Sequence, residues 1–359
     1  MIRAKLQELQ LDKHLRALYK KYEQILIPGF LVFGFLGDIF TFQALQIATT
    51  LKLLFGYLVL AAASMVYLYW FDAHKKEAHP AILIYLRFAA PLAIQLSFGA
   101  LLSAALLFYW FSGAFAVSWP LFAVIVAIMI SSEVFRHIFV RPTVQLTVYS
   151  FVFFSYLSIL LPYALNSLAG WLFAVSGVIS TLGTLALAAL LSRFVPRIRQ
   201  APGQIYVGVV GVFLAMSTFY LFNLIPPLPL TLRDIGVYHN VERVGDSYQL
   251  ISERETFIEK LIPGKTLTLD EDGAIYIFNS IFAPANIVTT IYHRWEYKNE
   301  DGRWVTSDRL QFLVRGGRSD GYRAYTFKSG LTPGAWRVTV ENDRGQTLGR
   351  IHFTLVTAK

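Results

Sequence analysis

Residues 145–165 read QLTVYSFVFFSYLSILLPYAL, a run of 21 residues without a charged side chain. An α-helix needs about 20 mostly apolar residues to cross the hydrocarbon core of a bilayer. Stretches of similar length and composition occur at 25–45, 50–71, 89–113, 118–138, 169–192 and 204–226. Together they predict an integral membrane protein, a polytopic α-helical bundle of about seven spans. The stretch 80–113 is too long for one upright helix, and Pro91 predicts a break within it.

The composition changes near Pro226-Pro227. The whole chain is 55% hydrophobic and only 15% charged, whereas soluble domains carry about 25% charged residues. From residue 232 onward, charged residues occur throughout the sequence. We therefore predict a cytoplasmic amphipathic helix over residues 1–24, a transmembrane bundle over 25–230 and a water-soluble domain over 231–359.

Basic residues indicate the orientation in the membrane. Lys and Arg occur in the N-terminal segment and in the second-to-third, fourth-to-fifth and sixth-to-seventh loops, but not near 46–49, 114–117 or 166–168. Under the positive-inside rule, this alternation places the N-terminus in the cytoplasm. An odd number of spans then places residues 231–359 outside, which is the periplasm if the host is a Gram-negative bacterium.

The C-terminal domain has a period of two. Polar and apolar residues alternate at 274–278, 287–295, 310–314, 322–328, 336–340 and 349–356. The turn sequences Asn299–Gly302 and Asn342–Gly345 suit hairpins between such strands. About eight short strands without helical periodicity predict an all-β sandwich of immunoglobulin-like build.

Charge and cysteine content exclude several classes of function. The net charge is +9, but residues from 232 onward contain seventeen Lys and Arg against sixteen Asp and Glu. The soluble domain is therefore almost neutral, and we predict no nucleic-acid partner. The absence of cysteine rules out disulfides, thiolate metal sites and a cysteine nucleophile. We predict no metal site and no cofactor, since no complete ligand motif occurs.

Several motifs resemble one protein family. They are His293–Trp295, Gly316–Tyr325 and Gly334–Val338 in the soluble domain, and Gly34–Asp38, Gln95–Ala100, Ser132–Arg136 and Ile225–Leu230 in the membrane part. They are similar to the bacterial domain-of-unknown-function family numbered 2914, over most of the chain. The resemblance implies an inner-membrane protein with an extracytoplasmic C-terminal domain, and it implies no reaction and no ligand.

Ionisable residues within the predicted spans are functional candidates, because charges in hydrocarbon are costly. Asp38 lies in the first span and could be an ion or headgroup site, or could pair with Lys52 of the second span. At the end of the fourth span, Glu133 and His137 share a helix face at i, i+4 spacing and could act in acid–base chemistry. Alternatively, Glu133 could form an ion pair with Arg136.

The soluble domain contains a glycine-rich stretch, Gly316–Gly321, beside arginines and tyrosines. Guanidinium groups bind carboxylates and phosphates, and tyrosines stack on sugars or peptides. Arg318, Arg323 and Tyr325 are therefore ligand-binding candidates. Strand alternation places residues 323 and 325 on one face and Tyr322 on the other. The same stretch could instead be a turn held by hydrogen bonds from arginine.

Two functions remain open from the sequence. The first is a cell-envelope binding or scaffolding protein, held in the lipid bilayer, whose β-sandwich recognises a saccharide, a peptide or a protein. The second is a membrane enzyme or transporter that handles a lipid-linked or small polar substrate within the bundle. The absence of a complete catalytic set favours the first function.

Overall fold

The computed structural model describes residues 47–74, 79–112, 115–200, 202–227, 229–245, 247–251, 265–269, 273–284, 287–318 and 321–357. The chain divides into two compact units. The helical unit comprises Met1–Leu107, Phe122–Leu161 and Gly170–Thr218, and the β unit comprises Phe108–Leu121, Pro162–Ala169 and Phe219–Lys359. Since both units contain helix ends, the β unit includes more of the chain than the predicted domain over 231–359.

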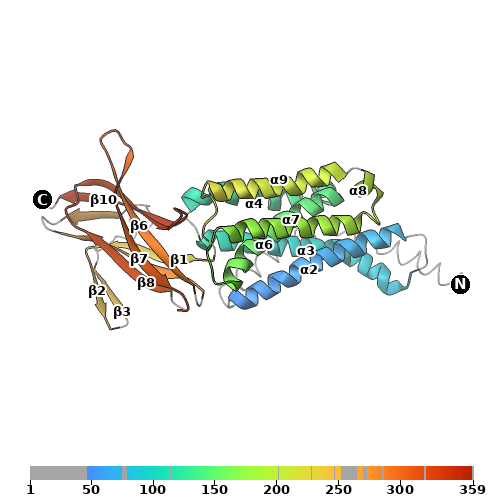
Figure 1. Cartoon of the computed structure of the whole chain (residues 1–359), viewed down its shortest axis with the longest axis horizontal. Coiled ribbons are helices and arrows are strands. Elements are labelled where there is room, and N and C mark those ends of the chain that lie inside the picture. Colours follow the sequence, from blue (N-terminus) through green and yellow to red (C-terminus); the bar gives the residue numbers. More distant parts are fainter. Residues whose placement is uncertain are drawn as a thin grey trace. The chain divides into compact units, whose positions relative to one another are not determined.

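The described residues form the helices α2 (Ile47–Ala73), α3 (Ala81–Ser112), α4 (Phe115–Val134), α5 (Arg136–Phe139), α6 (Pro142–Ala164), α7 (Trp171–Leu191), α8 (Pro196–Gln200) and α9 (Pro202–Leu221). Figure 1 labels these helices, apart from the single turn α5. Among the described residues, five helices are long and apolar enough to cross a membrane, namely α2, α3, α6, α7 and α9. Each matches a predicted span. The predicted span 25–45 and the amphipathic helix over 1–24 lie outside the described residues.

Two expectations about the helices need correction or refinement. Helix α3 runs through Pro91 without interruption, so the predicted break there is wrong. Proline removes one hydrogen bond and bends a helix, and a long apolar helix tolerates this when its neighbours supply packing. Helix α4 contains a shorter apolar stretch, Val117–Ser132, because the helix ends at Val134 and a separate single turn, α5, follows.

Small residues bring neighbouring helices close together. The buried Ser176 of α7 donates a hydrogen bond across to the carbonyl oxygen of Leu157 in α6, at 3.0 Å. Gly177 has the rings of Phe154 and Phe213 where a Cβ atom would lie, and Gly208 of α9 lies against Thr147 of α6. These contacts confirm that Gly208 is a packing residue, as small residues are between membrane helices.

Strands form the β unit: β1 (Thr231–Tyr238), β2 (Asn240–Val244), β3 (Ser247–Ile251), β4 (Lys265–Leu269), β5 (Ile275–Phe282), β6 (Val288–Lys298), β7 (Trp304–Arg315), β8 (Tyr322–Lys328), β9 (Gly334–Asn342) and β10 (Thr347–Thr357). A three-stranded sheet has the order β1-β5-β8, a five-stranded sheet has the order β4-β10-β9-β6-β7, and β2 pairs with β3. All pairs are antiparallel except β4 with β10. Both predicted turns connect hairpins, β6 to β7 and β9 to β10.

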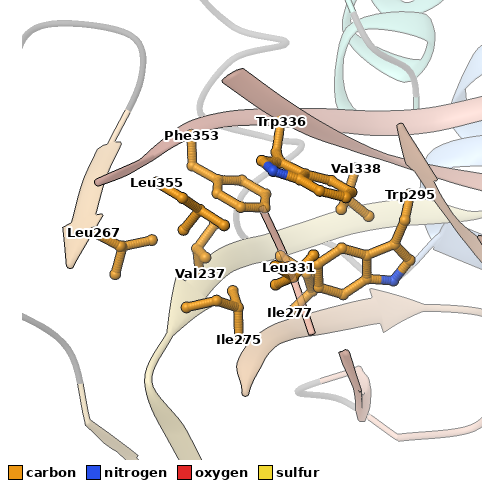
Figure 2. Packing of buried hydrophobic residues seen from close by; sticks show 10 residues of the cluster. All are labelled: Val237, Leu267, Ile275, Ile277, Trp295, Leu331, Trp336, Val338, Phe353 and Leu355. Atoms are coloured by element: carbon orange, nitrogen blue, oxygen red, sulfur yellow. The ribbon is translucent and has the colours of Figure 1, made fainter. Parts of the chain in front are cut away.

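The two larger sheets share a hydrophobic core, part of which Figure 2 shows. Ile275 and Ile277 come from the three-stranded sheet, and Trp295, Trp336 and Phe353 come from the five-stranded sheet. The rings of Trp295 and Phe353 meet edge to face, with centroids 6.2 Å apart. Large aromatic side chains contribute most of the burial in such a core.

A second cluster completes the core of the β unit. Its buried members include Leu230, Ile281, Ile291 and Val340, and Leu168 packs against it. Leu168 precedes α7 and belongs to the β unit. The connection between α6 and α7 therefore contributes to the packing of the β unit.

A polar trio lies within this core, between the sheets. His293 of β6 is fully buried. The side-chain amide of Asn279 donates to His293 Nε2 at 2.7 Å, so Nδ1 carries the proton and donates to Oγ1 of Thr326, also at 2.7 Å. Burial lowers the pKa of His293 to about 3, because water that would solvate an imidazolium is excluded.

This trio predicts that the β unit loses stability in mild acid. The unfolded chain binds a proton at His293 below about pH 6.5, whereas the folded state does not until about pH 3. The unfolded state therefore binds more protons in this window, and the free energy of unfolding should fall by up to about 1.4 kcal/mol per pH unit as pH decreases. Urea unfolding of the detergent-solubilised protein, followed by tryptophan fluorescence, measures the slope.

The matched variant is His293→Gln, which keeps a donor and an acceptor but does not titrate. The free energy of unfolding of the variant should depend less steeply on pH. The difference in slope should correspond to about one proton fewer bound on unfolding. An identical slope in the variant and the natural protein would show that other groups cause the acid sensitivity.

Candidate functional site: an arginine–glutamate face

The outer face of the five-stranded sheet carries charged residues at alternate positions of adjacent strands. We call it the arginine–glutamate face, and it comprises Arg294, Glu296, Arg309, Arg337, Thr339, Glu341 and Arg350. The register places Arg294 opposite Arg309 of β7 and Thr339 of β9, and Thr339 opposite Arg350 of β10. A row of arginines therefore crosses the sheet, and such a row needs carboxylates beside it, because like charges on facing strands repel.

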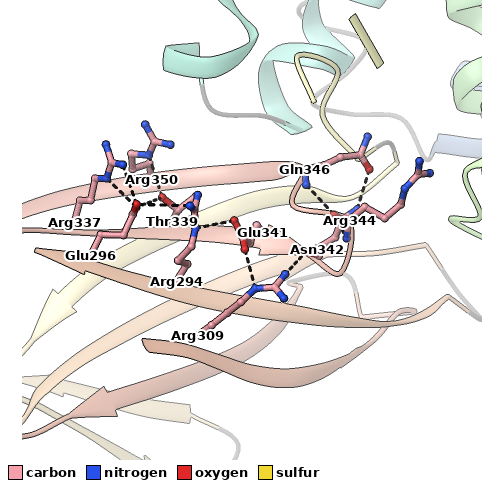
Figure 3. Close-up of polar contacts among 10 residues, drawn as sticks. All are labelled: Arg294, Glu296, Arg309, Arg337, Thr339, Glu341, Asn342, Arg344, Gln346 and Arg350. Atoms are coloured by element: carbon pink, nitrogen blue, oxygen red, sulfur yellow. Dashed lines mark hydrogen bonds and ion pairs between the residues drawn. The ribbon is translucent and has the colours of Figure 1, made fainter. Parts of the chain in front are cut away.

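Glu296 lies on one side of this row (Figure 3). Arg337 donates to both carboxylate oxygens, from Nε at 2.8 Å and from Nη2 at 2.9 Å. Arg294 Nη1 lies 3.6 Å from the same carboxylate. Burial alone would raise the pKa of Glu296, but the hydrogen bonds from Arg337 and the charges of the nearby arginines hold it below its usual value. Glu296 is therefore ionised at neutral pH.

Glu341 lies on the other side of the row. Its Oε1 accepts a hydrogen bond from Arg309 Nε at 2.9 Å, and its Oε2 lies 3.1 Å from Arg294 Nε. Arg309 is the more exposed of these arginines, with 40% of its side chain accessible, while Glu341 is only 5% accessible. The two glutamates thus lie beneath the guanidinium groups and fix their positions.

The face carries more positive than negative charge. Arg294, Arg309, Arg337 and Arg350 lie beside Glu296 and Glu341, which leaves an excess of two positive charges. Burial lowers the pKa of Arg350, and the positive charge of Arg337 lowers it further. Arg350 donates from Nε to Oγ1 of Thr339 at 3.0 Å. Guanidinium groups held in this way bind carboxylates and phosphates with defined geometry.

Aromatic rings lie beside the guanidinium groups. The guanidinium carbon of Arg309 is 3.8 Å from the centre of the Tyr292 ring, and that of Arg337 is 4.5 Å from the Trp304 ring. Trp304 also meets the His352 ring at 5.8 Å. The face therefore combines fixed cations with flat apolar surfaces.

The predicted ligand residues of the β unit lie on the other sheet and its loop. Arg318 is exposed and lies 5.6 Å from the centre of the Tyr322 ring. Arg323 and Tyr325 of β8 are paired with Ser280 and Phe278 of β5. Tyr322 packs against the second core cluster, which agrees with the predicted alternation. The role of Arg318, Arg323 and Tyr325 as ligand residues stays a prediction.

The glycine-rich stretch has a structural explanation. A Cβ atom on Gly316 would collide with the carbonyl oxygen of Pro284. The amide nitrogens of Gly316 and Gly317 donate to the carbonyl oxygens of Ile287, at 2.8 Å, and Ala283, at 3.1 Å. Glycine is therefore required at 316 by close backbone approach, and backbone hydrogen bonds help to hold the loop.

The candidates of the predicted spans are only partly described. Asp38 lies outside the described residues, and Lys52 is exposed on α2. Glu133 belongs to α4, whereas Arg136 and His137 belong to α5, and the side chains of all three lie outside the described part. Their proposed pairings stay predictions. Among the described residues, no group of three or more His, Cys, Asp or Glu side chains could hold a metal ion.

The sequence reasoning missed the arginine–glutamate face. Its members alternate along β6 as Arg294 and Glu296, and along β9 as Arg337, Thr339 and Glu341. That alternation was visible and indicates an outer strand face. The order of the strands, with β9 between β6 and β10, was the missing information.

A comparison with family models gave a match to part of the β unit. A family model described as "Protein of unknown function (DUF2914)" matches residues 288–355. This stretch belongs to that family. The resemblance inferred from the sequence is thus confirmed there, while the motifs of the membrane part lie outside the matched residues. All seven members of the arginine–glutamate face lie within the DUF2914 stretch.

The other comparisons add no functional information. A search of curated proteins gave no match. Among solved structures, the chain is similar to Pseudomonas fluorescens alkylpurine DNA glycosylase AlkC bound to DNA containing an abasic site analog, at 11% identity over 85% of this chain and 98% of that chain. The TM-score is 0.22, which is too low to establish a common fold.

The Glu296 site predicts a large stability difference between two similar substitutions. Glu296→Ala leaves Arg337, 17% accessible, without its carboxylate, which should cost about 3 kcal/mol in free energy of unfolding. Glu300→Ala, in the exposed β6–β7 turn, should change it by less than about 0.5 kcal/mol. Denaturant unfolding of both purified variants measures the difference, and equal stabilities would show that Glu296 does not hold the face together.

Proposed function

We propose that the protein is a bacterial inner-membrane protein of the cell envelope whose β unit binds an acidic saccharide on the arginine–glutamate face. The proposal includes about seven spans, a cytoplasmic N-terminus and a periplasmic β domain of immunoglobulin-like build. Five long apolar helices, the alternation of basic loops and the shared core of the two larger sheets support this arrangement.

One observation supports the choice of an anionic ligand. The face holds the guanidinium groups of Arg294, Arg309, Arg337 and Arg350 beside the buried carboxylates of Glu296 and Glu341. Ion pairs that served stability alone would reach charge balance, because each uncompensated charge near a partly buried site costs free energy. Arg350 and Arg309 lie three strand spacings apart, so separate anionic groups of one extended ligand would compensate the excess at each of them. The ordering of these side chains is already achieved by Glu341 and Thr339.

Two features favour a saccharide over an acidic peptide. Extended peptides usually bind at the edge of a sheet, where backbone hydrogen bonds are available. Apart from Arg309 of the edge strand β7, the members of the face lie on the interior strands β6, β9 and β10. The face of a sheet offers side chains alone. Tyr292 and Trp304 present flat rings next to guanidinium groups, and this combination suits a sugar ring that carries a carboxylate.

The alternative function, a membrane enzyme or transporter, depends on Asp38 and Glu133. The side chains of both residues lie outside the described part. That alternative therefore stays a prediction.

The binding test uses the full chain in detergent and an oligogalacturonate as the probe. Isothermal titration calorimetry should detect binding that weakens as salt increases, because salt screens exposed charges. Arg350→Ala should weaken binding by about tenfold or more, the usual effect of removing a charge-assisted hydrogen bond. Arg303→Ala, on the exposed β6–β7 turn, should bind like the natural protein.

Two further probes make this test decisive. A neutral oligosaccharide of equal length should not bind. Stronger binding of a polyglutamate peptide than of the oligogalacturonate would assign the face to a peptide and overturn the proposal. Circular dichroism of Arg350→Ala confirms that lost binding is not lost folding.

Orientation is tested by reporter fusions. Alkaline phosphatase is active only outside the cytoplasm, so a fusion after Lys359 should be active and a fusion after Lys76 should be inactive. The reverse pattern would overturn the proposed orientation and the periplasmic location of the β unit.

A further inference from the structure

The turn between β9 and β10 connects the arginine–glutamate face with the end of helix α9. Asn342 is the centre of this turn. Its Oδ1 accepts hydrogen bonds from the backbone nitrogens of Arg344, at 3.1 Å, and Gln346, at 2.9 Å. Its Nδ2 donates to Gln346 Oε1 at 2.9 Å. Both amide side chains are buried, so the turn has one well-defined shape.

On one side, the turn is bonded to the face. Arg309 donates from Nη2 to the carbonyl oxygen of Asn342, at 3.3 Å, and from Nε to Glu341. One guanidinium group thus contacts both a carboxylate of the face and the backbone of the turn. Arg309 is also the most accessible of the arginines paired with glutamate on this face. A ligand that moves Arg309 must therefore act on the turn.

On the other side, the turn is bonded to the end of α9. Gln346 donates from Nε2 to the carbonyl oxygen of Ile225 at 3.2 Å. Arg344 donates from Nη1 to the hydroxyl of Tyr220, and its guanidinium carbon lies 4.8 Å from the centre of the Tyr220 ring. Tyr220 is in the last turn of α9. Figure 3 shows the turn residues and the face together.

The end of α9 is itself a fixed structure. Asn223 has a φ of 56°. The backbone nitrogens of Asn223 and Leu224 donate to the carbonyl oxygens of Tyr220, at 3.1 Å, and Phe219, at 2.8 Å. This pattern is a Schellman cap with asparagine in the left-handed position. Pro226 and Pro227 follow, and proline restricts the backbone. We therefore expect a shift of the β9–β10 turn to move the end of α9, because the cap and the two prolines restrict the backbone there.

We propose that the β9–β10 turn couples ligand binding on the arginine–glutamate face to the end of α9, so that the β unit acts as a sensor for the membrane helices. This rests on the proposed function for the identity of the ligand. The polar contacts run from Glu341 through Arg309, Asn342 and Gln346 to Ile225. Both ends of this path are in the β unit, and α9 continues from there into the helical unit.

The test uses a fluorescent reporter at the end of α9. Since the chain has no cysteine, Phe222→Cys, at a position that is 73% exposed, gives one labelling site for an environment-sensitive dye. Titration of the labelled full chain with oligogalacturonate should shift the dye emission with the midpoint of binding. Adding Arg344→Ala and Gln346→Ala should abolish the shift, while the affinity stays within about threefold, because these residues lie outside the face.

A second arm needs no ligand and separates this proposal from the proposed function. Arg309→Ala should shift the dye emission by itself, and the shift should disappear when Arg344 and Gln346 are also alanine. Arg303→Ala should cause no shift. If oligogalacturonate fails to bind but Arg309→Ala shifts the emission through the turn, the coupling stands and the ligand assignment is wrong. If Arg309→Ala causes no shift, or the shift persists without Arg344 and Gln346, the coupling is overturned.

Discussion

The register of strand β6 is the constraint on which the β unit depends. It puts His293 and Trp295 in the core and Arg294 and Glu296 on the outer face. A slip of one residue against β9 would exchange these pairs, burying two charges and exposing an indole. The free energy gained by burying Trp295 and the free-energy cost of burying charged groups therefore favour the same register. The core and the arginine–glutamate face are two consequences of one alignment.

The two faces of β6 handle polar groups in opposite ways. On the inner face, His293 is neutral, because burial lowers its pKa and only neutral partners, Asn279 and Thr326, surround it. On the outer face, Glu296 is equally inaccessible but stays charged, because Arg337 binds both of its oxygens. A buried ion pair of this kind adds little net stability. It does orient the guanidinium groups, which is what a binding face requires.

The parts that could be predicted from the sequence are those set by local residue patterns. Apolar runs predicted about seven spans, and five long apolar helices match them among the described residues. Alternation with turn residues at Asn299–Gly302 and Asn342–Gly345 predicted the β6–β7 and β9–β10 hairpins. The predicted break at Pro91 was wrong, because a long packed helix such as α3 tolerates one missing backbone hydrogen bond. The site predicted at Arg318 and Arg323 rests on their closeness in sequence, and it stays a prediction. The actual charged face joins Arg294, Arg309, Arg337 and Arg350, which only the strand order brings together.

The chemistry of the β9–β10 turn suits a link between a charged face and a membrane helix. Asn342 and Gln346 are amides, and each offers a donor and an acceptor without a charge. Ionised side chains at such buried positions would need further partners to offset their desolvation. The amides instead form a continuous path of hydrogen bonds from Arg309 to the Ile225 carbonyl, so a change in the position of Arg309 can move the residues at the end of α9. The charged residues of this turn, Asp343 and Arg344, are both exposed, and Arg344 stacks on Tyr220. The charged side chains of the turn thus stay at the surface. The buried amides of Asn342 and Gln346 connect Arg309 with the Ile225 carbonyl.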